Sequence, residues 1–269
     1  MSAYLSSDAL PSPQFKSPIP VAPVPPSSEP TKTLGQETKN DIKEKDAHPL
    51  QYYVKASFMI TYILLLTTAT ITFIEAIRTD IPEVRHVMNL ETAISVIAGY
   101  FYSLFIAQIE EYGKKNQPVD WSDITKTRYI DWSVTTPLML LTLCIALGQE
   151  TKIKVPFTIL MAIIVMNYAM LYIGYLGETK VFSLFFASCL GFVPFTIMFY
   201  LIYITFVQPK YSFSNQVIFW LYSTIWSLYG CVYLLNDEWK NISMNILDFT
   251  AKCFVGLGLW LYYSKTVVA

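Results

Sequence analysis

Residues 241–263 read NISMNILDFTAKCFVGLGLWLYY, an apolar stretch with an acid, Asp248, and an amine, Lys252, in its interior. Such a stretch is long enough to cross a bilayer, because about 20 helical residues span the hydrocarbon core. A charged side chain near the bilayer centre costs about 3 kcal/mol on insertion scales. Both groups therefore need partners inside the protein, and the pair predicts a functional site within a membrane-embedded bundle.

The composition of the whole chain is typical of a polytopic membrane protein. Of its 269 residues, 54% are hydrophobic and 14% are charged, whereas soluble domains carry about a quarter charged residues. The formal net charge is -1, and without a basic cluster we expect no nucleic-acid partner. His48 and His86 lie outside the apolar segments, and the cysteines are scattered. We therefore expect no metal site.

Hydropathy predicts an all-α protein in which seven helices cross the membrane. Residues 1–50 hold nine of the fifteen prolines and a mixed-charge run, a composition that predicts a disordered N-terminal tail. Residues 51–269 then form the transmembrane domain. The predicted helices are 52–77, 88–112, 124–148, 154–176, 180–207, 215–236 and 241–265.

Two of these helices carry charge at helical spacing. Arg128, Asp131 and Thr135 are separated by three and four residues, so they share one face of the third helix. Asp248 and Lys252 share a face of the seventh by the same rule. If the two faces meet, two carboxylates face one guanidinium and one amine, and the formal charge sums to zero. A purely structural salt-bridge network remains an alternative at this point.

Three motifs together resemble those of the microbial (type 1) rhodopsins. They are RYIDWSVTTPL at 128–138, W-x-x-Y at 226–229 and LDFTAK at 247–252. The resemblance covers roughly residues 50–265, and KNISMNILD is most similar to the rhodopsins of large algal and protist viruses. It implies a seven-helix bundle that binds all-trans retinal as a covalent Schiff base on Lys252.

The resemblance also implies roles for the charged residues. Asp131 and Asp248 would be the counterions of the positively charged Lys252 nitrogen, and Asp131 would accept its proton. Thr135 would hydrogen-bond the Asp131 carboxylate. Arg128 would hold the anionic cluster together and respond to its protonation.

The chromophore pocket carries over position by position. Trp132 and Trp226 would enclose the polyene of retinal, while Tyr102 and Tyr229 would donate hydrogen bonds to Asp248. The remaining pocket positions implied by the resemblance are Thr136, Met139, Met170, Gly174, Phe186, Cys189, Tyr233 and Ala251.

The chain departs from the family pattern in two places. Gly230 stands where proline is usual after Tyr229, and Thr142 stands where archaeal pumps have the carboxylate that returns a proton to the Schiff base. Glu91, eleven residues before Tyr102, is a candidate replacement for that carboxylate. The alternative is that Glu91 caps the first turn of its helix or extends to the membrane interface.

We expect the protein to be a light-driven outward proton pump. We do not expect it to be an enzyme. Because Asp131 is an acid, a chloride pump is disfavoured, and the residue triplet of sodium pumps is absent. Three alternatives stay open: a light-gated cation channel that uses Glu91, Glu110 and Glu111, a slow sensory photoreceptor, and a light-independent transporter with a buried ion pair. We expect a lipid bilayer, protons or other small cations and further copies of the chain as partners. The N-terminus is expected outside the cell and the C-terminus in the cytoplasm.

Overall fold

The structure is a computed structural model that describes residues 49–115 and 117–268. This part of the chain forms seven helical rods and contains no strand, which confirms the predicted all-α bundle. The predicted disordered tail lies outside the described residues. In chain order the elements are α2 (Pro49–Arg78), α3 (Pro82–Lys114), α4 (Trp121–Thr151), α5 (Phe157–Glu178), α6 (Leu184–Ile202) with η1 (Tyr203–Val207), α7 (Phe213–Val232), and the last rod α8 (Asp237–Asp248), η2 (Phe249–Phe254) and α9 (Val255–Val268).

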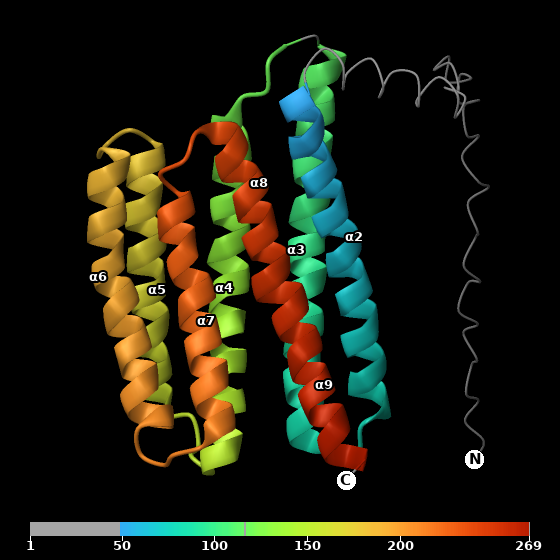
Figure 1. The fold of residues 1–269 in the computed structure, drawn as a ribbon, viewed down its shortest axis with the longest axis vertical. Coiled ribbons are helices and arrows are strands. Elements are labelled where there is room, and N and C mark those ends of the chain that lie inside the picture. Colours follow the sequence, from blue (N-terminus) through green and yellow to red (C-terminus); the bar gives the residue numbers. More distant parts are fainter. Residues whose placement is uncertain (1–48, 116, 269) are drawn as a thin grey trace, which may run out of the picture. The chain divides into compact units, whose positions relative to one another are not determined.

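The described helices have the lengths and composition that a bilayer demands. Six of the seven rods are long and apolar enough to cross a membrane. The last rod is one of these six, over Asp237–Tyr263. The remaining rod, α7, has 20 residues and runs alongside the others (Figure 1). The protein is therefore an integral, multi-pass membrane protein.

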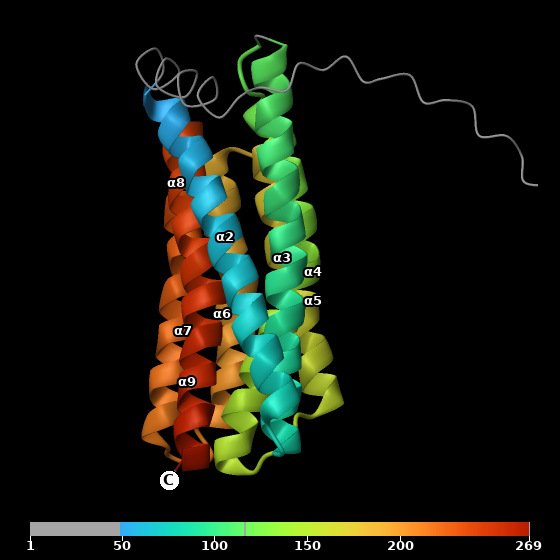
Figure 2. The same cartoon turned by 90° about the vertical axis from the view of Figure 1, so that its right-hand side faces the viewer.

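The seven rods run up and down, each packed against its neighbours in the chain (Figures 1 and 2). α2 packs on α3, α3 on α4, α4 on α5 and α5 on α6. The last rod closes the bundle, because α8 contacts both α2 and α7. Residues from α3, α4, α7 and the last rod can therefore converge on one interior.

Local signals explain where several helices begin. Pro82 is at the start of α3, where its missing N–H costs nothing, so this helix begins six residues before the predicted limit at 88. Asp120 caps α4 by accepting a hydrogen bond from the Ser122 N–H at 2.9 Å. Ser183 caps α6 in the same way through the Phe186 N–H, so this helix begins at Leu184, four residues after the predicted start at 180.

The last rod is interrupted by a π-helical turn, η2, over Phe249–Phe254. This turn follows Asp248 and contains Lys252, the two charged residues that the sequence singles out. Single π-helical turns inside α-helices occur frequently at functional sites, because the altered hydrogen-bond ladder rotates one side chain relative to the rest of the helix.

Candidate functional site

The amine of Lys252 lies between two carboxylates in the interior of the bundle. Its Nζ atom donates a hydrogen bond to Asp131 Oδ2 at 2.9 Å and is 3.7 Å from Asp248 Oδ2. The side chains of all three residues are at most 1% exposed. The charged faces of the third and seventh helices thus meet, as the zero-sum charge argument predicts.

The two carboxylates have very different surroundings. Asp248 accepts hydrogen bonds from Tyr102 Oη at 2.8 Å, Tyr229 Oη at 2.6 Å and Trp132 Nε1 at 3.3 Å. On Asp131, by contrast, the Oδ1 atom is buried and has no hydrogen-bond partner among the described residues. Both tyrosines therefore lie where the sequence analysis placed them, and within this part of the chain the Asp131 carboxylate has Lys252 as its one hydrogen-bond donor.

Arg128 contacts one carboxylate of the cluster and two amides. Its Nη1 atom lies 3.4 Å from Asp248 Oδ2, and its Nη2 atom donates to Asn241 Oδ1 at 3.0 Å and to Asn245 Oδ1 at 2.9 Å. The guanidinium is thus hydrogen-bonded to Asp248 and not to Asp131. This refines the prediction that Arg128 holds the whole anionic cluster.

The two asparagines are functional candidates that the sequence analysis missed. Asn245 is fully buried, accepts a hydrogen bond from Tyr102 and donates to Ser57 Oγ at 2.8 Å. A signal was present, because Asn241, Asn245 and Asp248 are spaced by four and three residues on one face of the last rod. The sequence analysis considered charged residues and not amides, although a buried amide also needs hydrogen-bond partners.

The predicted role of Thr135 requires a correction. Its hydroxyl donates to the backbone oxygen of Asp131 at 2.9 Å and not to the carboxylate. Thr136 makes the same kind of bond to the Trp132 backbone oxygen at 2.6 Å and accepts one from Asn167 Nδ2 at 2.8 Å. Threonine in a helix readily bonds to the carbonyl four residues earlier, and this local partner prevails over the more distant carboxylate.

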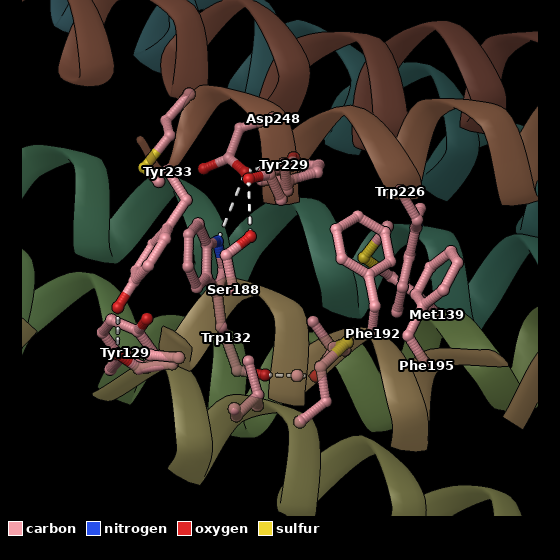
Figure 3. Close-up of a pocket in the computed structure, with 18 of the residues that line it drawn as sticks. Tyr129, Trp132, Met139, Ser188, Phe192, Phe195, Trp226, Tyr229, Tyr233 and Asp248 are labelled. Carbon is pink, nitrogen blue, oxygen red and sulfur yellow. Dashed lines mark hydrogen bonds between the residues drawn. The ribbon is translucent and has the colours of Figure 1, made fainter. Parts of the chain in front are cut away.

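A pocket lies between α4, α5, α6 and α7, and Asp248 and Lys252 of the last rod also line it. About 820 Å³ of empty space lies between its walls, including the part open to the outside. Figure 3 shows Trp132 and Tyr229 near Asp248, while Phe192, Phe195 and Trp226 gather with Met139 at the other end. The predicted positions that line it are Trp132, Thr136, Met139, Met170, Gly174, Trp226, Tyr229, Tyr233 and Lys252.

Some predicted pocket residues lie elsewhere. Phe186 is 51% exposed and Cys189 is exposed, and the residues of α6 that line the pocket are instead Ala187, Ser188, Gly191 and others. Each helical residue turns the side chain by about 100°, so an error of one position in counting moves it off the pocket face. Tyr102 and Ala251 are buried but do not line the pocket. Tyr102 contacts Asp248, which does line it.

The departure at Gly230 has a clear steric consequence. A Cβ atom at this position would lie 2.5 Å from the Phe192 ring, so the ring occupies the space that a larger residue would fill. The Gly230 carbonyl also accepts a hydrogen bond from Ser188 Oγ at 3.2 Å. Gly230 and Phe192 thus shape one wall of the pocket together.

Known proteins share both the sequence pattern and this arrangement. The sequence profile described as "Bacteriorhodopsin-like protein" matches residues 53–266. The chain belongs to this family. Bacteriorhodopsin from Halobacterium salinarum is 29% identical over 210 residues, which cover 71% of each chain.

Solved structures of the family superpose on the bundle. The viral rhodopsin OLPVRII is 40% identical, with a TM-score of 0.73 over 79% of this chain and 98% of that one. The proton pumping rhodopsin AR2 from the marine alga Acetabularia acetabulum has the same fold at 20% identity, with a TM-score of 0.64 over 81% of this chain and 97% of that one. Membership of a rhodopsin family implies a retinal chromophore.

The residues of the pocket fit such a group. Retinal is a long apolar aldehyde, and the walls of the pocket are mainly aromatic and aliphatic side chains that end at a buried amine. Ligand pockets are commonly lined by apolar and aromatic side chains with few polar groups. The amine and the two carboxylates stand at one end, where a positive charge on the Lys252 nitrogen would be balanced.

Glu91 lies in the interior near the start of α3, whereas Arg128 lies near the start of α4, which runs in the opposite direction along the bundle (Figure 1). It is nine residues beyond the start of α3 at Pro82 and is 2% exposed. Its burial and its position inside α3 argue against the alternative that it caps the helix. Ser95, one turn further along α3, is also buried, and its hydroxyl has no hydrogen-bond partner.

A second buried ion pair lies at the opposite end of the bundle from Glu91. Lys240 Nζ is 3.1 Å from Glu178 and 3.3 Å from Asp237. The Lys240 side chain is 5% exposed and that of Glu178 is 12% exposed, whereas that of Asp237 is 57% exposed. This pair joins the end of α5 to the start of α8.

Proposed function

We propose that the protein is a light-driven proton pump that moves protons outward and holds retinal on Lys252. When bound as a Schiff base, retinal supplies the absorption of visible light and a light-driven change of shape at the Lys252 nitrogen. The observation that carries the proposal is the contact of 2.9 Å between Lys252 Nζ and Asp131 Oδ2, both buried.

The unequal surroundings of the two acids assign their roles. Three hydrogen bonds and the Arg128 guanidinium stabilise Asp248 as an anion. Among the described residues, Lys252 alone donates a hydrogen bond to the Asp131 carboxylate, and the other carboxylate oxygen is buried without a partner. A proton that leaves Lys252 therefore goes to Asp131, while Asp248 stays charged and neutralises Arg128.

A pump also needs a group that returns a proton to Lys252 from the other side. Glu91 is the buried acid on that side, whereas the Thr142 hydroxyl is far too weak an acid to store a proton and donates a hydrogen bond to the Leu138 carbonyl. Ser95 lies one turn from Glu91 towards Tyr102, so its free hydroxyl is placed to pass a proton along. We therefore assign Glu91 as the proton store.

The direction of transport follows from the proposed orientation. We place the start of α2 and the ion pair of Lys240 outside the cell, and the C-terminal end of the last rod in the cytoplasm, as in the resembling family. Glu91 then lies on the cytoplasmic side of Lys252 and Arg128 on the outer side. A proton that passes from Glu91 through Lys252 to Asp131 moves outward.

The channel alternative receives little support from its other two acids. The Glu110 and Glu111 side chains are 49% and 65% exposed, and each is paired with a lysine, Lys55 and Lys115. They do not extend the buried polar path that Glu91 begins. A continuous acidic lining for cations is therefore not supported along α3.

A photocurrent–voltage curve tests the proposal. In cells that make the protein and are given all-trans retinal, light should drive outward current at zero voltage without an ion gradient. The variant Asp131→Asn should carry none, because the acceptor is gone. A current that reverses at the equilibrium potential of a permeant cation would establish a channel, and no current with a long-lived photoproduct would establish a sensor.

A further inference from the structure

Gly256 of α9 lies directly against the carboxyl group of Glu91. A Cβ atom built at Gly256 would be 2.7 Å from Glu91 Oε2, 3.5 Å from Glu91 Cδ and 3.4 Å from Thr68 Cγ2. Because real side chains avoid such a distance from an oxygen, any residue larger than glycine would displace the carboxyl group. The carboxyl group therefore occupies the space that a side chain at position 256 would need.

The backbone does not require glycine at this position. Gly256 lies within a regular helix, and none of the described glycines has a positive φ. In a helix interior, glycine costs about 1 kcal/mol relative to alanine. Its presence is thus explained by the room it leaves and not by its conformation.

This room lies one helical turn beyond Lys252. Gly256 follows Lys252 by four residues, and the end of η2 at Phe254 lies between them, so Gly256 is about one helical turn further along the last rod. The Glu91 carboxyl is therefore held on the side of Lys252 that faces away from Asp248.

The other groups near Glu91 do not fix its carboxyl by charge. Among the described residues no ion pair involves Glu91, and the titratable groups that interact with it are Tyr222 of α7 and Cys253 of η2. Both are buried or nearly so and uncharged at neutral pH. The steric fit against Gly256 is accordingly the contact that positions the acid.

We propose that Gly256 is a positioning residue for proton return. Because it has no side chain, the Glu91 carboxyl can lie one helical turn from Lys252. The inference rests on the proposed function of Glu91 as proton store. A side chain at position 256 moves the carboxyl away and lengthens the path to the Lys252 nitrogen.

The test uses two glycines of the same helix. Gly256→Ala places a methyl group against Glu91, whereas Gly258→Ala is a matched control because nothing lies within 4 Å of its Cβ position. After a light flash, the state in which the Lys252 nitrogen lacks its proton should decay about tenfold more slowly in Gly256→Ala, part of the roughly 100-fold that a placed acid contributes. Gly258→Ala should decay at the wild-type rate.

Two further variants separate this inference from the proposed function. Glu91→Gln should slow the decay, and azide should restore it, because a small diffusible acid replaces the missing one. In the Glu91→Gln background, Gly256→Ala should add nothing. A wild-type rate in Gly256→Ala beside a slow Glu91→Gln overturns the positioning role alone. A wild-type rate in Glu91→Gln overturns the proton store and the inference with it.

A measurement in the dark tests the steric contact without the photocycle. Gly256→Ala should lower the unfolding temperature in wild type but not in the Glu91→Ala background, where the carboxyl no longer collides. Gly258→Ala should behave alike in both backgrounds. If Gly256→Ala does not fold, recovery of folding by Glu91→Ala supports the contact. If the double variant also fails to fold, Gly256 serves another packing purpose and the proposal is wrong.

Discussion

At the scale of single residues, the site is organised by how many donors each carboxylate receives. Asp248 accepts from two tyrosines and one tryptophan and lies 3.4 Å from Arg128. Asp131 accepts from Lys252 at 2.9 Å. Two aspartates on facing helices thus differ in chemistry, because hydrogen bonds to the charged form of an acid stabilise that form.

This difference predicts unequal effects of removing the two charges. Asp248→Asn leaves Arg128 without its carboxylate, and breaking a buried pair in this way costs about 3–5 kcal/mol. Asp131→Asn leaves Lys252 with Asp248 nearby and should cost clearly less. Thermal unfolding of the two variants in one detergent measures the difference, and equal losses of stability would contradict the unequal roles.

At the scale of helices, buried ion pairs act as clamps between rods that are distant in sequence. Lys240 at the start of α8 reaches Glu178 at the end of α5, 62 residues earlier. Exposed pairs on the same molecule join neighbouring rods only weakly. Lys55 and Glu110 approach to 4.0 Å with side chains 24% and 49% exposed.

The clamp predicts a matched pair of results. Glu178→Gln should lower stability by about 1–3 kcal/mol, because a buried amine loses its charged partner and keeps only Asp237. Glu110→Gln should change stability by less than about 1 kcal/mol, as expected for an exposed pair. Unfolding temperatures of both variants at low salt give the comparison. Equal, small changes would show that the Lys240 pair behaves as a surface contact.

At the scale of the whole bundle, the pocket lies between rods that also share one hydrophobic core of buried side chains. Residues of α4, α5, α6, α7 and the last rod surround it. A ligand that fills this space binds the folded state and not the unfolded chain, so it stabilises the whole bundle.

Chromophore loading should therefore have both a spectral and a stability effect. Protein given all-trans retinal should become coloured, and its unfolding temperature should rise by several degrees above that of retinal-free protein. Lys252→Ala should bind no visible chromophore and show no such rise. A full visible band in Lys252→Ala would contradict the assignment of Lys252 as the attachment point.

Much of this architecture could be predicted from local patterns. A run of apolar residues specifies a membrane helix, because an unsatisfied backbone group in lipid is too costly. Helical spacing then places Arg128 with Asp131, and Asp248 with Lys252, on common faces. Charge balance predicts that these two faces meet, because an unpaired buried charge destabilises the fold. The sequence by itself thus determined the seven rods, the charged interior and the family to which the chain belongs.

Only the tertiary structure decided which partner each of these groups takes. Arg128 contacts Asp248 and two asparagines of the last rod. Thr135 donates a hydrogen bond to a backbone carbonyl. Glu91 contacts Gly256, which lies 165 residues later in the chain. These choices depend on how each helix is rotated about its axis and how closely its neighbours approach. Helical periodicity is a local property and contains neither quantity, because both are set by packing between rods that are far apart in sequence.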